Sequence, residues 1–145
     1  MATIKLSVVS PDRLVYENDI AMLIVRSTGG ELGILPRHAP LVTGLIPHAM
    51  RIKLPGEAAE HLLAVGGGFM EVTPEKIAVM VSAAEEPEEI DVLRAQRSLA
   101  RAKERIAAFG KGAANDATDI DMERARLSLM RAVARLKATG NDVDA

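Results

Sequence analysis

The chain divides into two parts that differ in charge and in hydrophobic period. Residues 1–90 carry 12 acidic and 7 basic side chains, and their apolar residues come in short runs of the kind found in β-strands. Residues 91–137 carry 6 acidic and 11 basic side chains, and their apolar residues recur every three or four positions, as in helices. An acidic β-unit joined to a basic helical pair predicts a protein that works through contacts and through movement of one part against the other.

The composition excludes several classes of site. The 145 residues, 48% of them hydrophobic, suffice for one domain, or for one domain with a small appendage. The chain has no cysteine, which excludes disulfides, thiolate zinc sites and cysteine nucleophiles. No apolar run approaches the roughly 20 residues that a membrane-spanning helix needs, so we expect any membrane association to come through a partner.

Short apolar runs separated by turn residues fill the N-terminal part. Proline and glycine punctuate the runs, and no long helical pattern intervenes. We therefore predict a β-sandwich or barrel of short strands over residues 1–86. The predicted strands cover residues 4–8, 14–16, 21–25, 33–36, 49–54, 62–65, 69–72 and 77–81.

Three segments of this part carry more specific predictions. Residues 21–25 are apolar throughout, which predicts a strand covered on both faces. Three consecutive glycines, residues 66–68, predict a bulge or a close approach of two backbones. The acidic run, residues 85–89, reads as a solvated linker in which Pro87 prevents an earlier helix start, and we place the linker itself at residues 87–90.

The spacing of apolar residues in the C-terminal part predicts an antiparallel two-helix hairpin over residues 91–137. We expect a flexible tail at residues 138–145. Asp91 is suited to cap the first helix. Alanine occupies alternate seam positions, so the helices can approach closely but bury little area, and the hairpin needs a docking surface on the β-unit or on another subunit. The predicted seam residues are Val92, Ala95, Leu99, Ala102 and Ile106, and then Met122, Ala125, Leu129, Ala132 and Leu136.

A second stripe along the helices is basic. A stripe of this kind is usually a solvated face, but helix one has little acidic charge to neutralise it, which is also consistent with an anionic partner. This basic stripe comprises Arg94, Arg97, Arg101 and Arg105 on the first helix and Arg124, Arg131 and Arg135 on the second.

No constellation in the sequence supports catalysis or metal binding. His38, His48 and His61 lie 10 and 13 residues apart, and no carboxylate completes a metal-ligand pattern with them. There is no Gly-x-Ser-x-Gly nucleophile motif, and the triple glycine precedes a strand rather than the helix that a phosphate loop requires. We therefore predict no catalytic and no metal-binding residues, and hence no enzyme.

Five segments form a distinctive set that extends over nearly the whole chain. They are SVVSPD at residues 7–12, GELGILPRHAPLV at 30–42, GGFMEV at 67–72, IDVLRA at 90–95 and RAVARL at 131–136. Together they resemble the ε-subunit family of bacterial F-type ATP synthases. That family has a β-sandwich followed by a helical hairpin, which is also the fold class that the residues predict.

The resemblance implies a non-catalytic central-stalk subunit that is peripheral on the cytoplasmic side of the cell membrane. In this family the sandwich sits on the rotor, against the γ subunit and the c-ring, and helps couple proton or sodium flow to ATP synthesis. The hairpin lies folded on the sandwich or extends toward the catalytic α/β hexamer, where it opposes ATP hydrolysis. The implied contacts with the acidic C-terminal region of the β subunit are Arg97, Arg101, Arg124 and Arg131.

Some members of the family bind regulatory ATP at the folded hairpin, although no cofactor is required. Arginines from two facing helices can clamp phosphates. The same motif can instead only organise the hairpin, with Asp91 as the cap and Arg94 paired to it. The residues that match the family's nucleotide site are Glu85, Ile90, Asp91, Arg94, Ala95, Arg131 and Arg135.

Two other functions stay open at this point. The chain could be a stand-alone regulatory ATP-binding module, or a basic helical adaptor for nucleic acid. The second is disfavoured by the acidic N-terminal part and by the scarcity of aromatic side chains for base stacking.

Overall fold

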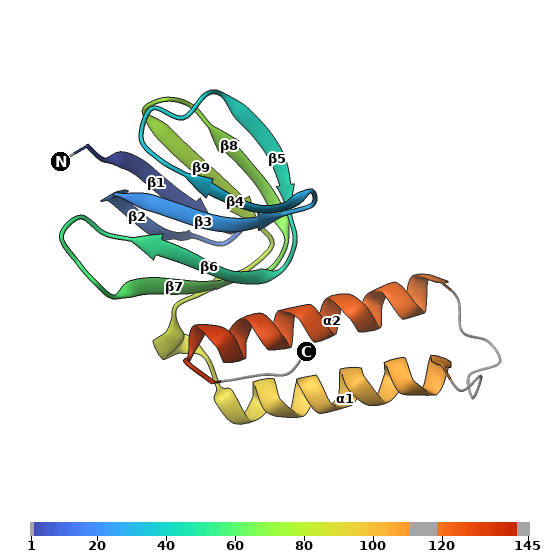
Figure 1. Ribbon diagram of the computed structural model, residues 1–145. Coiled ribbons are helices and arrows are strands. Elements are labelled where there is room, and N and C mark those ends of the chain that lie inside the picture. The colour runs from blue at the N-terminus through green and yellow to red at the C-terminus, as the bar shows by residue number, and fades with distance from the viewer. Residues whose placement is uncertain (1, 111–118, 142–145) are drawn as a thin grey trace.

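The computed structural model describes residues 2–110 and 119–141, which form a β-sandwich followed by two antiparallel helices (Figure 1). The helix α2 lies between the sandwich and α1 (Figure 1). The predicted fold class is confirmed. The strands are β1 (Ile4–Val9), β2 (Leu14–Ile20), β3 (Met22–Ser27), β4 (Gly30–Ile34), β5 (Leu41–Leu45), β6 (His48–Lys53), β7 (Glu60–Val65), β8 (Gly68–Val72), β9 (Lys76–Val81) and β10 (Ala84–Glu85). The helices are the 3-10 turn η1 (Pro87–Glu89), α1 (Val92–Gly110) and α2 (Asp119–Ala138).

One ten-stranded sheet folds over on itself into a nearly closed sandwich. The strand order is β10-β7-β6-β3-β5-β8-β9-β1-β2, and β4 pairs with β3 outside this path. All the pairs are antiparallel except β1 with β9, which is parallel. Figure 1 shows β8, β9 and β5 on the side away from the helices, and β6 and β7 facing them.

The core is built from aliphatic and methionine side chains rather than aromatic ones. In β3, β6, β8 and β9 alternate residues are buried, so these strands place one face in the core. The largest fully buried side chains include Leu6, Leu23, Met50, Met70 and Ile77. Since the sequence has only three aromatic residues, close packing of these side chains must supply the stability of the sandwich.

Several strands depart from the sequence-based expectation. β4 spans Gly30–Ile34 where residues 33–36 are predicted, β2 continues to Ile20, and the two-residue β10 is too short to show a period and is not predicted. β3 was expected to be covered on both faces, but only Leu23 and Val25 enter the core, while Ile24 on the outer face is half-buried. β5 was not predicted, because its short Leu-Val-Thr-Gly-Leu run follows a proline and contains a glycine. It nevertheless pairs along its whole length with β8.

The expected close approach of backbones occurs at Gly68. A Cβ atom placed on Gly68 would lie 2.1 Å from the carbonyl oxygen of Met80 and 2.7 Å from the Cα of Val81. Only a residue without a side chain fits at this point between β8 and β9. The triple glycine is therefore structural, and it does not form a ligand loop.

The predicted seam between the helices is found in part. Its four alanines and Leu136 are buried, whereas its other members are half-buried, and one of these, Leu129, lines a cavity on the sandwich side. The small alanine side chains let the two helices pack closely along their length.

The helix α2 runs to Ala138, so it extends one residue beyond the predicted end of the hairpin. Gly140 adopts a positive φ of 84°, and its N–H donates to the carbonyl of Lys137, while the N–H of Asn141 donates to the carbonyl of Leu136. This is the Schellman arrangement, which satisfies the last carbonyls of the helix. Residues 138–141 thus belong to the helix end, and the rest of the predicted tail, residues 142–145, lies outside the described residues.

The hairpin docks on the sandwich through α2. Ala134 and Ala138 of α2 form a small buried cluster with Ala64 of β7 and with Ile90, and Ala49 and Leu62 pack against it. The hairpin needs a docking surface, and in the structure this surface is the outer face of β6 and β7. Most side chains of the buried cluster are alanines, and each of them buries little apolar area.

Candidate functional site

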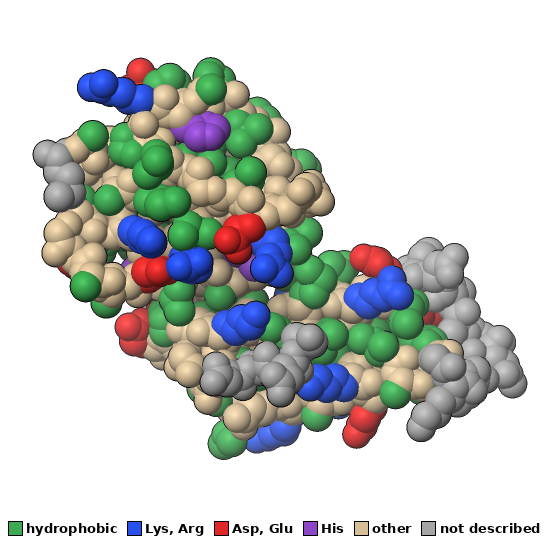
Figure 2. Space-filling view, in the orientation of Figure 1, with side chains coloured by type: hydrophobic (Ala, Val, Ile, Leu, Met, Phe, Trp, Pro, Cys, Tyr) green, Lys and Arg blue, Asp and Glu red, His purple; other side chains and the backbone are tan. Residues whose placement is uncertain are grey.

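The acidic run, residues 85–89, is tied to three separate parts of the fold. Glu85 pairs with α2, Glu86 with β7, and Glu89 with the turn between β1 and β2. The pairs, with their N–O distances, are Glu85–Arg135 (2.7 Å), Glu86–His61 (2.7 Å) and Glu89–Arg13 (2.6 Å). Figure 2 shows acidic and basic side chains gathered where the sandwich meets the helices.

The prediction of a solvated linker is wrong for Glu85 and Glu86. Glu85 belongs to β10, which pairs with β7, and both glutamates are half-buried. The partners lie far away in the sequence, Arg135 being 50 residues from Glu85, so the charge run alone did not reveal them. Glu85–Arg135 joins the sandwich to α2, whereas the contacts of Glu86 with His61 and of Glu89 with Arg13 hold the run against the sandwich. The acidic run therefore lies at the joint and contacts both parts.

Part of the predicted nucleotide set comes together at this joint. Glu85, Arg131 and Arg135 line one small pocket of about 10 Å³ between α2 and the edge formed by β7 and β10. The guanidinium of Arg135 already donates to Glu85 through Nε, whereas Arg131 is exposed and has no ion pair among the described residues. The pocket can bind a phosphate only if Arg135 turns from Glu85 or if the joint opens.

The remaining residues of that set occupy the start of α1. The carboxylate of Asp91 accepts a hydrogen bond from the backbone N–H of Arg94 at 3.1 Å, so Asp91 is the expected helix cap. Ala95 is buried in the helix seam, and Ile90 belongs to the docking cluster. The side chain of Arg94 is exposed. In this docked arrangement the Ile-Asp-x-x-Arg-Ala motif therefore shapes the hairpin entry.

The basic stripe faces solvent over most of its length. Arg97, Arg101 and Arg124 are exposed, and no ion pair involves them within residues 2–110 and 119–141. Of the stripe, Arg135 alone pairs with a carboxylate in that part of the chain. The hairpin thus carries positive charge that the sandwich does not neutralise, and it is available to an acidic partner.

A row of exposed apolar side chains crosses the sheet away from the helices. Strand register places Leu14 beside Val9, Val9 beside Met80, and Met80 beside Phe69. Phe69 is 62% exposed and Met80 is 48% exposed. The sequence does not reveal this apolar row, because the row depends on which strands are neighbours in the sheet. Large apolar side chains gathered in one exposed place are typical of a contact surface.

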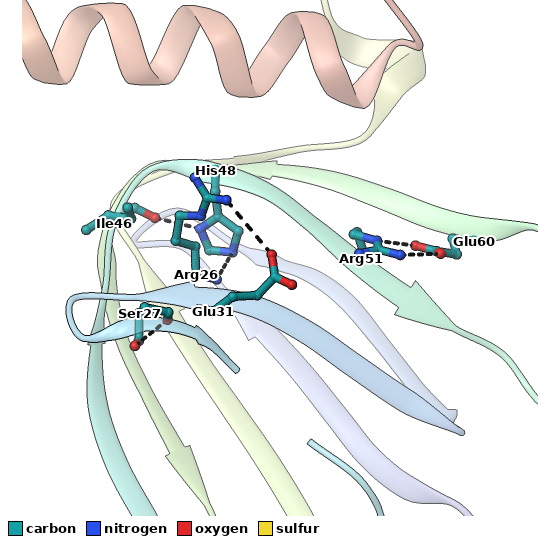
Figure 3. A network of polar contacts seen from close by, with 8 residues as sticks. Arg26, Ser27, Glu31, Ile46, His48, Arg51 and Glu60 are labelled. Atoms are coloured by element: carbon teal, nitrogen blue, oxygen red, sulfur yellow. Dashed lines mark hydrogen bonds and ion pairs between the residues drawn. The ribbon is translucent and has the colours of Figure 1, made fainter. Parts of the chain in front are cut away.

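A polar network near α2 engages both nitrogens of one histidine. The backbone N–H of Arg26 donates to Nε2 of His48 at 3.1 Å, and Nδ1 of His48 lies 2.6 Å from the carbonyl oxygen of Ile46, to which it donates (Figure 3). This pattern requires the neutral ring with its proton on Nδ1. Burial lowers the pKa of His48, and the nearby Arg26 cation lowers it further against the opposing effects of the Ile46 carbonyl and Glu31.

The lowered pKa makes the folded chain sensitive to acid. As the pH decreases, the unfolded chain takes up a proton at His48 before the folded chain does. The contribution of His48 to the free energy of unfolding is therefore complete above the ordinary histidine pKa of about 6.5, and it decreases as the pH falls through that value. We expect the free energy of unfolding in urea to decrease between about pH 7.5 and about pH 5.5. In the His48→Gln variant, the free energy of unfolding should depend less steeply on pH than in the parent chain. Equal slopes for the variant and the parent chain would contradict this assignment.

Comparison with known proteins accounts for both parts of the chain. Residues 3–87 match the family profile described as ATP synthase, Delta/Epsilon chain, beta-sandwich domain, and residues 88–140 match ATP synthase, Delta/Epsilon chain, long alpha-helix domain. The chain belongs to the delta/epsilon chain family of ATP synthases. The suspected resemblance is confirmed, and neither the stand-alone ATP-binding module nor the nucleic-acid adaptor is supported.

Bacterial members of this family resemble the chain over most of its length. The ATP synthase epsilon chain of Anoxybacillus flavithermus is 48% identical over 108 residues, which cover 74% of this chain and 79% of the relative. That of Alkalihalophilus pseudofirmus is 46% identical over 106 residues, covering 73% and 78%.

Solved members of ATP synthase assemblies share the fold. A chain of the Euglena gracilis mitochondrial ATP synthase, in an OSCP/F1/c-ring structure, superposes with a TM-score of 0.76 at 20% identity, covering 97% of this chain and 83% of that one. A chain of the Tetrahymena thermophila mitochondrial ATP synthase, in a structure of the central stalk and c-ring, superposes with a TM-score of 0.62 at 16% identity. The match covers 95% of this chain and 97% of that one. Within the described residues, no helix is both long and apolar enough to cross a membrane.

Proposed function

We propose that the chain is the non-catalytic epsilon subunit of the central stalk, held on the rotor by its sandwich and regulating hydrolysis through its hairpin. Family membership supports the assignment to the ATP synthase, and the apolar row is the single feature of the chain that best supports a permanent partner. The partners are the γ subunit and the c-ring, and the chain is peripheral on the cytoplasmic side of the cell membrane. It would contribute to coupling proton or sodium flow to ATP synthesis.

The apolar row is suited to a lasting contact. Its side chains lie on β2, β1, β9 and β8, which leaves β6 and β7 to hold the hairpin. The chain can therefore bind a rotor partner through one face while the hairpin docks on or leaves the other. Adding the purified chain to a complex depleted of its own epsilon subunit should give stoichiometric co-elution with γ, and a failure to co-elute would contradict the stalk assignment.

The hairpin would regulate hydrolysis by leaving the sandwich. Its docking cluster is small, and its unpaired arginines are suited to the acidic C-terminal region of the β subunit. Partly desolvated charge pairs contribute about 1 kcal/mol each. A few such pairs would suffice to shift the equilibrium between the docked and the extended hairpin, if the two differ by a few kcal/mol. The arginines that would make these pairs are Arg97, Arg101, Arg124 and Arg131.

Regulatory ATP would stabilise the docked position by bridging the helices and the joint. Arg131 supplies an unpaired guanidinium to the small pocket, and Arg135 lies one helical turn away. A bound polyphosphate would replace Glu85 as the partner of Arg135. Since ATP would bind the docked hairpin in preference to the extended one, it would hold the subunit in its non-inhibitory state.

Calorimetry of ATP with the purified chain measures this binding directly. We expect Arg131→Ala and Arg135→Ala each to weaken the Kd about tenfold or more, because each removes a charged donor to phosphate. Arg126→Ala is the matched control, since Arg126 is exposed on α2 but does not line the pocket. Unchanged affinity in both pocket variants, or no heat of binding with the parent chain, would contradict nucleotide regulation.

A further inference from the structure

A second and much larger cavity lies between the sandwich and α2, on β3, β6 and β7. This interdomain cleft encloses about 770 Å³. It shares one lining residue, Ala134, with the small pocket at the joint, so the two are separate sites. Figure 3 shows the polar side chains of the cleft on the strands that face α2. Cavities of about 300–1,000 Å³ at domain interfaces are typical of small-molecule sites.

The interdomain cleft has apolar side chains on both of its sides, next to the polar ones. The outer face of β3, which its sequence predicts to be covered, contributes Ile24, and β6 and β7 contribute Ala49 and Leu62. Across from them, α2 presents Leu129 and Val133, which are only half-buried although the helix is docked. In the docked arrangement, none of the hairpin side chains that the structure describes covers the apolar surface on either side of the cleft. An apolar ligand in the cleft would remove this surface from water.

The charges around the cleft are largely, but not completely, balanced. Arg51 donates through two nitrogens to the two carboxylate oxygens of Glu60 at 2.6 and 2.7 Å, and this bidentate bond lowers the pKa of Glu60 (Figure 3). Arg26 and Glu31 approach less closely, at 3.9 Å. Lys137 of α2 lines the cleft and has no ion pair among the described residues. One positive charge is therefore unmatched.

We propose that the interdomain cleft binds an amphipathic monoanion, a compact apolar body with a single carboxylate or sulfonate head. The apolar body would lie between Ile24, Leu62 and Val133, and the head would pair with Lys137. His48 is not available to the anion, because both of its nitrogens are engaged. The volume of the cleft falls in the range typical of small-molecule sites.

Such a ligand would act on the position of the hairpin. It would touch the sandwich and α2 together, so it would bind the docked arrangement and not one in which α2 has left β6 and β7. The cleft is formed by the docked chain without ATP and without other subunits. A test of binding to the cleft is therefore independent of nucleotide binding and of inhibition in the complex.

Two matched probes test the proposal on the purified full chain. The first is 8-anilinonaphthalene-1-sulfonate, and the second is N-phenyl-1-naphthylamine, which has the same apolar body without the sulfonate. We expect saturable binding of one sulfonate probe per chain by calorimetry and fluorescence. Lys137→Gln should weaken it about tenfold, Lys137→Arg should retain it, and the uncharged probe should bind weakly and be insensitive to Lys137.

A second variant fills the cleft. Val133→Phe should abolish binding of both probes, while Arg126→Gln, on the same helix but outside the cleft, should leave both unchanged. A circular dichroism melt shows whether each variant is folded. If Val133→Phe does not fold, Lys137→Gln still tests the proposal. Absence of saturable binding, equal affinity for the two probes, or binding unaffected by Lys137→Gln would each overturn the proposal.

Discussion

Deleting residues 91–145 should raise the ATPase rate of the complex. The main core of the sandwich is built from strand residues without any described side chain of the hairpin, so the truncated chain should still fold and bind the rotor. It loses the hairpin, which under the proposed function extends toward the catalytic hexamer. If the extended position is favoured by about 1.4 kcal/mol, only about one complex in ten is uninhibited, and truncation should increase hydrolysis about tenfold.

The measurement is steady-state ATP hydrolysis by complexes rebuilt with the full or the truncated chain. Co-elution of the truncated chain with γ is the control for assembly. A truncated complex that assembles fully but hydrolyses ATP no faster would show that this hairpin does not inhibit, while leaving the stalk assignment intact.

Placing charge in the apolar row should abolish assembly. Burial of each large apolar side chain contributes about 1.5–3 kcal/mol, and an unpaired carboxylate in the same contact is unfavourable. The double change Phe69→Glu and Met80→Glu should therefore weaken association with the rotor by roughly 10²–10⁴-fold, measured as the concentration of chain needed to reconstitute a depleted complex. Since both side chains are largely exposed, the free variant should retain its thermal stability.

The matched control for this variant lies on the hairpin. Leu93 is a large apolar residue that is similarly exposed, at 64%, but it belongs to α1 rather than to the sheet. Leu93→Glu should assemble as the parent chain does. Equal loss of assembly in Leu93→Glu and the double variant, or normal assembly of both, would show that the apolar row is not the rotor contact.

Features governed by local periodicity could be predicted from the sequence. The alanine seam, the Asp91 cap and the close approach at Gly68 all follow from patterns within a few residues, and the structure has each of them. The need for a docking surface followed from the small area that an alanine seam can bury. The motif resemblance gave the family.

Features that depend on long-range register could not be predicted. The pairing of Glu89 with Arg13 joins residues 76 apart, and the apolar row depends on β1 lying between β2 and β9. The interdomain cleft likewise exists only because α2 docks at its C-terminal end, near Ala134 and Ala138, and leaves Ile24 uncovered. Each of these arises from topology that no segment of the sequence specifies alone.

Reversible locking of the hairpin tests the central claim, that a weakly docked arm leaves the sandwich to inhibit hydrolysis. Ala64 of β7 and Ala134 of α2 belong to one buried cluster, and the chain has no native cysteine, so Ala64→Cys with Ala134→Cys introduces a single possible disulfide within the subunit. We expect the oxidised complex to hydrolyse ATP at the rate of the truncated complex, and the reduced complex to be inhibited again. An oxidised complex that stays as inhibited as the reduced one would contradict the account.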